Sequence, residues 1–287
     1  MSGYSLSELK SGGLMKQKEK DLFSLRLRIV GGFVDASQLI KLSEIANKYG
    51  KGHIHLTTRQ GVEIPNINLK DVEKVKKEIG KAGLQMGACG QRVRTVTACQ
   101  GKECSHGLID CFLLAKDIDK EYFGIGGHPH KFKIGITGCP NGCIKPQEND
   151  LGIMGRLRKK FIKEKCNYCG LCASVCPVNA IKVNKGSDDI VFYEDKCIGC
   201  GDCVHSCPTN AWQKRQEGYS IFVGGKMGKF PKLGIKVFDF IETRGKVLDI
   251  IKKSLGFYKE FGKIGERFRD TLDKVGIDKY KKTYYNK

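Results

Sequence analysis

The N-terminal part of the chain shows two different spacings of apolar and polar residues. Between Leu22 and Val30 apolar residues alternate with polar ones, which is the pattern of a half-buried strand. Residues 36–49 instead carry apolar side chains three or four positions apart, the spacing of one helix face. Asp35 stands where an N-cap belongs and Gly50 where a helix stops, so the pattern predicts a helix between them.

Two further elements follow in the same part of the chain. Residues 53–65 have the composition of an extended segment. Val72, Val75 and Ile79 then mark one face of a second helix, which we expect to end at Gly80. Strand, helix, strand and helix together predict a small α+β unit.

The remainder of the chain changes composition twice. Short strands punctuated by glycine and cysteine run to about residue 143, and a cysteine-dense stretch begins at Lys165 and ends near Trp212. A strand-and-turn pattern then returns, which predicts a compact unit inserted into a larger domain. Residues 246–287 mix lysine and arginine with apolar residues at helical spacing, Ile264 among them, and predict amphipathic helices with a solvated face.

Composition narrows the class of protein. Hydrophobic residues make up 40% of the 287 positions, and no apolar run reaches the length of a membrane span. The first residues lack the features of a signal peptide, so we expect a cytoplasmic protein. In a reducing compartment, 14 cysteines favour metal binding over disulfides. The net charge of +20 fits an acidic partner or a lysine-rich surface, whereas the aromatic residues follow core periodicity and argue against nucleic-acid binding.

Two copies of one cysteine motif give the strongest chemical signal. Each copy has the spacing Cys-x-x-Cys-x-x-Cys-x-x-x-Cys-Pro, which is the bacterial ferredoxin pattern for 4Fe-4S clusters, and the fourth cysteine of each run binds the other cluster. Zinc would need only four ligands for each ion and has no use for the third close cysteine or the proline. The motif therefore predicts two clusters, with the ligands Cys166, Cys169, Cys172, Cys176, Cys197, Cys200, Cys203 and Cys207.

A second set of cysteines lies outside the ferredoxin motif. Two separated pairs supply the right number of thiolates for one more cubane, namely Cys99, Cys104, Cys139 and Cys143. Cys89 and Cys111 are left over, and we expect them to pack as small apolar side chains.

Three short segments place pairs of cations on one face of a strand. Successive strand side chains point to opposite sides, so each pair stands opposite apolar neighbours. The pairs are Arg26 with Arg28, Arg92 with Arg94, and Lys131 with Lys133. Together with Arg59 they predict a site for an anion, because guanidinium and ammonium groups match oxyanions and carboxylates. His128 and His130 adjoin the lysines; an axial-ligand or proton-relay role is the alternative, but we expect both to face solvent.

These motifs resemble a known enzyme family. Leu25-Arg-Leu-Arg-Ile-Val-Gly-Gly32, Leu56-Thr-Thr-Arg-Gln-Gly61, Cys99-Gln-Gly, Lys131-Phe-Lys133 and Thr137-Gly-Cys-Pro-Asn-Gly-Cys143 occur in the order found in siroheme-dependent sulfite and nitrite reductases. Within that family the chain resembles the catalytic polypeptide, the C subunit, of anaerobic sulfite reductases and small dissimilatory-sulfite-reductase-like proteins with an inserted ferredoxin unit. The resemblance covers about residues 22–240.

The resemblance implies a fold and a domain division. The fold is α+β, a sulfite-reductase-type siroheme domain with a ferredoxin-like N-terminal unit, an α/β cofactor domain and an inserted bacterial-type ferredoxin domain. We expect four parts: the N-terminal unit in 1–84, the first part of the siroheme domain in 85–160, the inserted ferredoxin domain in 161–213, and the second part with C-terminal helices in 214–287.

Roles for individual residues also follow from the resemblance. Cys99, Cys104, Cys139 and Cys143 match the siroheme-coupled cluster, and Cys143 also bridges to the siroheme iron. The family's sulfite-coordinating cations match Arg28, Arg94, Lys131 and Lys133. Siroheme carboxylates are held where this chain has Arg26, Thr57, Thr58, Arg59 and Gln60. The family usually has five residues between the first two cluster cysteines and this chain has four, so Cys111 stays an alternative to Cys104.

The function that the resemblance implies is six-electron reduction of sulfite to sulfide, with siroheme and three 4Fe-4S clusters. Electrons would enter through the inserted ferredoxin domain from reduced ferredoxin or a partner reductase subunit, because no dinucleotide-binding motif is present. Alternatives are nitrite reduction to ammonia and a non-catalytic siroheme or electron-transfer protein. Larger family members contain two copies of the reductase repeat, whereas this chain has one, so we expect a homodimer.

Overall fold

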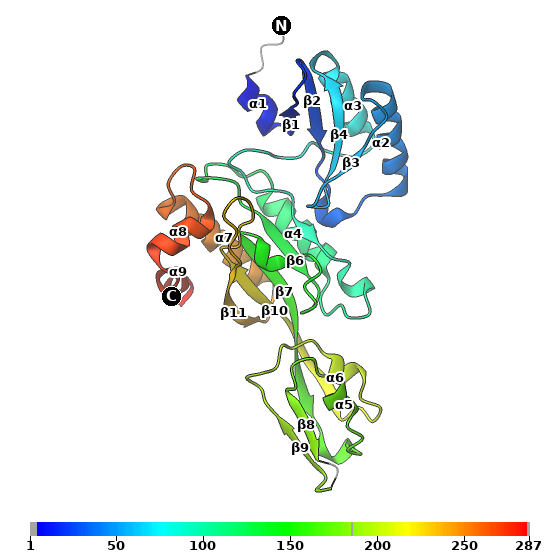
Figure 1. Ribbon diagram of the computed structural model, residues 1–287, viewed down its shortest axis with the longest axis vertical. Coiled ribbons are helices and arrows are strands. Elements are labelled where there is room, and N and C mark those ends of the chain that lie inside the picture. The colour runs from blue at the N-terminus through cyan, green and yellow to red at the C-terminus, as the bar shows by residue number, and fades with distance from the viewer. Residues whose placement is uncertain (1–4, 185, 286–287) are drawn as a thin grey trace.

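The computed structural model describes residues 5–184 and 186–285 of the chain. Its N-terminal unit is a four-stranded antiparallel sheet in the order β1-β2-β4-β3, on which two helices pack (Figure 1). The elements are α1 (Leu6–Ser11), β1 (Leu14–Lys16), β2 (Leu22–Arg26), α2 (Ala36–Tyr49), β3 (His55–Leu56), β4 (Val62–Asn68) and α3 (Val72–Lys81).

The two predicted helices of this unit are confirmed. α2 begins behind Asp35, whose side chain forms a capping box with Gln38, and ends before Gly50. α3 buries Val72, Val75 and Ile79 and extends one residue beyond the predicted end. Both helices bury their apolar faces against the sheet in one hydrophobic cluster.

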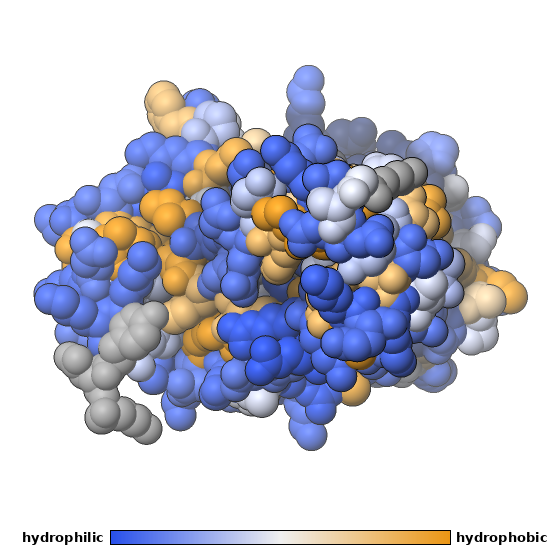
Figure 2. All heavy atoms as spheres, turned by 90° about the horizontal axis from the view of Figure 1, so that it is seen from below, coloured by the Kyte–Doolittle hydropathy of each residue, from blue (hydrophilic) through white to orange (hydrophobic). Residues whose placement is uncertain are grey.

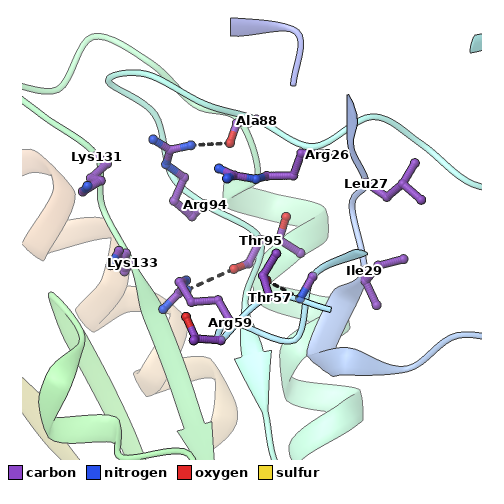
Figure 3. A pocket seen from close by; sticks show the side chains of 12 residues that line it. Arg26, Leu27, Ile29, Thr57, Arg59, Ala88, Arg94, Thr95, Lys131 and Lys133 are labelled. Atoms are coloured by element: carbon purple, nitrogen blue, oxygen red, sulfur yellow. Dashed lines mark hydrogen bonds between the residues drawn. The ribbon is translucent and has the colours of Figure 1, made fainter. Parts of the chain in front are cut away.

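The single extended segment predicted for residues 53–65 is wrong. The chain instead forms the hairpin strands β3 and β4, joined by a turn over Thr57–Gly61. The Gly61 N–H donates to the Thr57 hydroxyl at 3.0 Å, and Gln60 adopts a left-handed conformation with φ 56°. This turn carries Thr57, Thr58 and Arg59 to the face where the strand of Arg26 ends (Figure 3).

The central domain is a five-stranded mixed sheet in the order β11-β10-β7-β6-β5. β5, β6 and β7 are parallel, whereas β7, β10 and β11 are antiparallel. Helices α4 and α7 to α9 share one large core with the sheet. The elements are β5 (Thr97–Ala98), α4 (Cys111–Tyr122), β6 (Ile134–Thr137), β7 (Leu151–Phe161), β10 (Trp212–Val223), β11 (Ile235–Ile241), α7 (Arg244–Phe261), α8 (Phe268–Val275) and α9 (Ile277–Tyr285).

The C-terminal tail forms amphipathic helices, as predicted, with one exception. Ile264 lies in the connection between α7 and α8 and is 89% exposed, so it is not a core position. Val247, Ile251 and Phe268 are buried in the central core.

The cysteine-rich segment is inserted between the long paired strands β7 and β10. These strands pair from Leu151 opposite Val223 to Phe161 opposite Trp212, and they extend from the central sheet toward the inserted unit (Figure 1). The unit has a small core of its own and contains α5 (Leu171–Ser174), β8 (Ile181–Asn184), β9 (Asp189–Phe192) and α6 (Asp202–His205). Seen from that end of the molecule, the surface is mostly hydrophilic, with apolar side chains in separate groups (Figure 2).

Short 3-10 helices complete the chain. They are Val30–Gly32, Leu69–Asp71, Gly101–Glu103, Pro146–Glu148 and Lys163–Lys165. Over residues 5–184 and 186–285, none of the helices combines the length and apolar character that a membrane crossing requires.

Candidate active site

A cavity of about 230 Å³ lies between the N-terminal sheet and the central domain. On β2 the side chain of Leu25 is fully buried in the N-terminal core, whereas the next residue, Arg26, lines the cavity, as strand alternation requires. Leu27 and Ile29, which follow the strand, add apolar side chains to the lining. Five cationic side chains converge on the cavity, from β2, the β3–β4 turn, the loop before β5 and the segment that leads into β6 (Figure 3). They are Arg26, Arg59, Arg94, Lys131 and Lys133.

Hydrogen bonds to neutral groups fix two of the guanidiniums. Arg59 donates from Nη1 to Asn149 Oδ1 at 2.6 Å and from Nη2 to the carbonyl of Thr95 at 3.3 Å. Arg94 donates from Nη2 to the carbonyl of Gly90 at 3.0 Å. Its Nε is buried and has no hydrogen-bond partner among the described residues.

Burial and mutual repulsion lower the pKa values of the cations in this cavity. Burial, followed by repulsion from Arg59 and Lys131, lowers the pKa of Lys133 to about 8. Burial and the nearby Arg94 and Arg267 lower the pKa of Arg59 to about 10. Lys131 also has a lowered pKa, through burial and then repulsion from Arg267 and Arg94. Such a site gains stability when an anion enters it.

Residues that the sequence did not single out complete the cation site. Asp150 is fully buried, accepts hydrogen bonds from Arg267 Nη2 at 2.8 and 2.9 Å, and accepts another from the Lys133 N–H at 2.9 Å. Burial raises the pKa of Asp150, while the Arg267 charge opposes that rise. Arg267 is the N-cap residue of α8, so its bond to Asp150 ties the start of this helix to the segment that carries Lys133.

Arg28 does not line the cavity, unlike the other predicted sulfite-binding cations. Its Nε donates to the buried Asp119 of α4 at 2.7 Å, and its guanidinium stacks over Phe123 at 4.0 Å from the ring centroid. Arg92, the strand partner of Arg94, is exposed and also lies outside the lining.

A second cavity, of about 460 Å³, brings together the four separated cysteines predicted for a cubane. Cys99, Cys104, Cys139 and Cys143 all line it. Cys111 does not: it is fully buried, with its Sγ 3.7 Å from Cys99 Sγ. The Gly138 N–H donates to Cys99 Sγ at 3.0 Å, as backbone amides commonly do to cluster thiolates.

A third cavity, of about 500 Å³, joins the first two. It shares Gln60 and Cys143 with the cysteine cavity, and Arg59 and Lys133 with the cation cavity. The three cavities therefore adjoin one another and are together called the hollow, with Cys143 where the second meets the third and Lys133 where the third meets the first. A large anionic cofactor fits this lining, since guanidinium donors suit its carboxylates and the thiol suits a metal.

The eight ferredoxin-motif cysteines lie together in the inserted unit. Cys166, Cys169 and Cys172 of the first run surround one small cavity with Cys207 of the second, which matches the exchange of fourth ligands in this motif. Within the described residues, no three His, Cys, Asp or Glu side chains are placed to hold a single metal ion. In a cubane, by contrast, each thiolate binds a different iron.

The predictions for the two histidines and for Cys89 differ in how well they agree with the structure. His128 is 5% exposed, so the expectation that it faces solvent is wrong. His130 is half-buried, and its Nδ1 accepts a hydrogen bond from the Lys131 N–H at 2.7 Å. Cys89 is buried as expected, and it accepts a hydrogen bond from Arg26 Nη1 at 3.2 Å.

Comparison with known proteins agrees with this architecture. The sequence model of the "Nitrite and sulphite reductase 4Fe-4S domain" matches residues 89–287, and that of the "Nitrite/Sulfite reductase ferredoxin-like half domain" matches residues 15–82. These matches support the iron–sulfur and siroheme cofactors that the sequence implied, and they confirm the α+β fold class.

Two curated relatives and one solved structure are similar over most of the chain. A coenzyme F420-dependent sulfite reductase of Methanocaldococcus jannaschii is 39% identical over 94% of this chain, which spans 43% of that protein. The C subunit of the anaerobic sulfite reductase of Salmonella typhimurium is 32% identical over 82% of this chain and 74% of its own. The crystal structure of dissimilatory sulfite reductase I covers 93% of this chain and 69% of its own, with 20% identity and a TM-score of 0.78. With its two family domains, its cysteine cavity and its cation cavity, the chain belongs to the nitrite and sulfite reductase family of oxidoreductases.

Proposed function

We propose that this protein is a sulfite reductase that uses siroheme and three 4Fe-4S clusters to reduce sulfite to sulfide. The observation that carries the proposal is the row of adjoining cavities between Cys143 and the lysines Lys131 and Lys133. Two of the similar proteins are named sulfite reductases, and each matches most of this chain. The similar proteins named nitrite reductases match about half of the chain or less. This difference favours sulfite over nitrite.

The cofactor-binding residues follow from the hollow's lining. Cys99, Cys104, Cys139 and Cys143 would hold the cubane, with Cys104 preferred to Cys111 because it lines the cavity. Siroheme carboxylates would be held by Arg26, Thr57, Thr58, Arg59 and Gln60. When bound, siroheme supplies an iron that takes the substrate's sulfur and passes electrons to it.

The substrate-binding residues are Arg94, Lys131 and Lys133. Sulfite, six electrons and seven protons give hydrosulfide and three waters, so the pocket has to neutralise an anion and supply protons to departing oxygens. Arg94 offers a charge that its hydrogen bond to the Gly90 carbonyl holds at the cavity. Lys133, with its pKa lowered to about 8 by burial and neighbouring cations, can donate a proton near neutral pH. Arg28 is left out of this set because Asp119 binds it elsewhere.

Electrons would enter through the inserted unit. The second cysteine run adjoins the cysteine cavity: the Leu157 N–H donates to the Gly199 carbonyl at 2.9 Å, and a Cβ on Gly201 would stand 3.4 Å from Leu108 Cδ2. Gly107, next to Leu108, lines the cysteine cavity. The cluster that Cys197 would bind is therefore expected to be the nearer of the two ferredoxin clusters to the siroheme-coupled cluster. The electron source would be reduced ferredoxin or a partner reductase subunit.

A homodimer would supply the second reductase repeat that this chain lacks. Two-fold homodimers are the commonest oligomers, and one copy of each motif per chain suits such symmetry. Sedimentation of the fully loaded enzyme tests this proposal, and an active monomer would contradict it.

Anaerobic preparation of the intact protein tests the proposed function. We expect a macrocycle absorption band, about twelve cluster irons per chain, as three cubanes require, and turnover of sulfite with reduced methyl viologen as the donor. Rates on sulfite and nitrite, measured side by side, decide the substrate. A protein that carries iron and sulfide but never takes up a tetrapyrrole would refute the proposal.

A non-catalytic electron carrier is the remaining alternative. Substitution of both Lys131 and Lys133 by Met distinguishes the two. A sulfite reductase should keep its absorption spectrum and lose sulfite turnover, whereas a carrier should keep its spectrum and show no turnover before or after the substitution.

A further inference from the structure

Lys159 stands beside the second cysteine run of the inserted unit. β7 leaves the central sheet and carries this lysine to Cys197, where its Nζ donates a hydrogen bond to Sγ at 2.8 Å. The ammonium lies 4.2 Å from the centroid of the Phe192 ring on β9, a cation–π contact that holds it in place. The side chain is half-buried, so solvent screens its charge less than that of an exposed lysine.

The two cysteine runs are otherwise matched at this position. The Tyr168 N–H donates to Cys166 Sγ at 3.3 Å, and the Gly199 N–H donates to Cys197 Sγ at 3.4 Å. Among the described residues, no charged side chain donates to the ligands of the other cluster, which are Cys166, Cys169, Cys172 and Cys207. In the described part of the chain, their side-chain partner is the neutral hydroxyl of Thr209, 3.7 Å from Cys207 Sγ. The two sites therefore differ in that a cation donates to a ligand thiolate in only one of them, and that same site also has the Asp202 carboxylate beside Cys200.

The asymmetry has a direct electrochemical consequence. Hydrogen bonds to the cluster sulfurs and the local charge are two of the means by which a protein sets a cluster's reduction potential. A reduced cluster carries one more negative charge than the oxidised form, so a cation that donates to its thiolate stabilises the reduced form more.

We propose that Lys159 raises the reduction potential of the cluster bound by Cys197, Cys200 and Cys203 above that of its neighbour. Electrons then collect on the cluster that adjoins the cysteine cavity, and transfer through the inserted unit runs toward the siroheme-coupled cluster. The inference rests on the proposed function only in requiring that both ferredoxin clusters are present. Lys159 acts through Cys197 and does not contact the substrate, so it is a positioning residue.

A redox titration followed by electron paramagnetic resonance, on the anaerobic, cluster-loaded full chain, tests the proposal. We expect Lys159→Met to make reduction of one ferredoxin cluster at least tenfold less favourable, about 59 mV for one electron. The other two clusters should keep their potentials. Lys159→Arg retains a cation and a donor and should restore most of the shift. Lys160→Met, an exposed neighbour on the opposite face of β7, is the matched control and should shift nothing.

Two results would overturn the inference: no shift in Lys159→Met, or an equal shift of both ferredoxin clusters, which would indicate a general field effect. If the Met variant binds less iron, Lys159→Gln is titrated in its place, with a smaller shift in the same direction expected. Loss of iron from both variants would show that Lys159 has a structural role and would also overturn it. Because sulfite turnover is not the readout, a chain that titrates as expected but reduces no sulfite refutes the proposed function alone.

Discussion

Lys133 offers the sharpest test of the chemistry at the cation site. Its pKa is lowered to about 8 by burial and by Arg59 and Lys131, so at pH 7 it is mostly protonated yet readily gives up its proton. A positioned acid with a pKa near the working pH contributes roughly 10²- to 10⁴-fold to the rate. We expect Lys133→Met to lower sulfite turnover by about that factor. Because Lys133 lies on the cation side of the hollow, the iron content should be unchanged.

The pH dependence follows from the sign of the shift. A lysine donates only in its protonated form, and kcat/KM reports the pKa of the free enzyme. We therefore expect kcat/KM to hold steady below about pH 8 and to fall about tenfold for each pH unit above it. A lysine with the ordinary pKa of 10.5 would keep the profile flat for more than two further units.

Lys133→Arg is the matched control for charge without proton donation. It keeps a cation for sulfite but titrates far above the working range, so it should bind sulfite, react slowly and lose the decline near pH 8. Steady-state rates from pH 6 to 10 with reduced methyl viologen decide the matter. A wild-type profile that stays flat to pH 10, or a Met variant with full turnover, would refute the role of Lys133.

Three further substitutions separate binding from structure. Cys104→Ser should remove about one cubane of iron per chain, four atoms, whereas Cys111→Ser should keep all of it; iron and sulfide analysis distinguishes them, and the reverse outcome would make Cys111 the ligand. Asp150→Asn leaves Arg267 buried without its counter-ion and should lower the free energy of unfolding by about 3–5 kcal/mol, measured by denaturant titration; a loss under about 1 kcal/mol would mean that water reaches the pair. Arg28→Met should lower the melting temperature while turnover per bound siroheme stays unchanged, and a raised KM for sulfite would return Arg28 to the substrate site.

Local signals explain why the N-terminal helices could be predicted and the turn between β3 and β4 could not. α2 has a capping box at Asp35 and a glycine after its last residue, both readable from the sequence. The turn over Thr57–Gly61 closes through a threonine hydroxyl and a left-handed Gln60, which composition does not specify. The error mattered, because this turn positions Arg59.

In the candidate site, too, some residues could be predicted from the sequence pattern and others could not. The alternation of charged and apolar residues predicted an anion site that includes Arg26, Lys131 and Lys133, and the structure brings these three side chains to one cavity. The same pattern failed for Arg28, because its partner Asp119 lies 91 positions later in the chain. Arg267 was overlooked because nothing in the lysine-rich tail distinguishes it from Arg269 or shows that it reaches Asp150, 117 positions away. Pairings over such distances become visible only in three dimensions.

The distribution of acidic partners among the cations explains why this site requires a bound anion. Among the described residues, Glu63 pairs with Arg26 and Asp150 pairs with Arg267, whereas Arg59 and Arg94 donate to neutral oxygens. Lys133 is close enough to Arg59 that each disfavours the other's charge. The protein alone therefore leaves positive charge uncompensated in a cavity with limited access to water, and such charge is costly until an anion enters. Anions that bind only the folded chain stabilise it by mass action, so cofactor carboxylates and substrate are expected to complete the fold of this site as well as its chemistry.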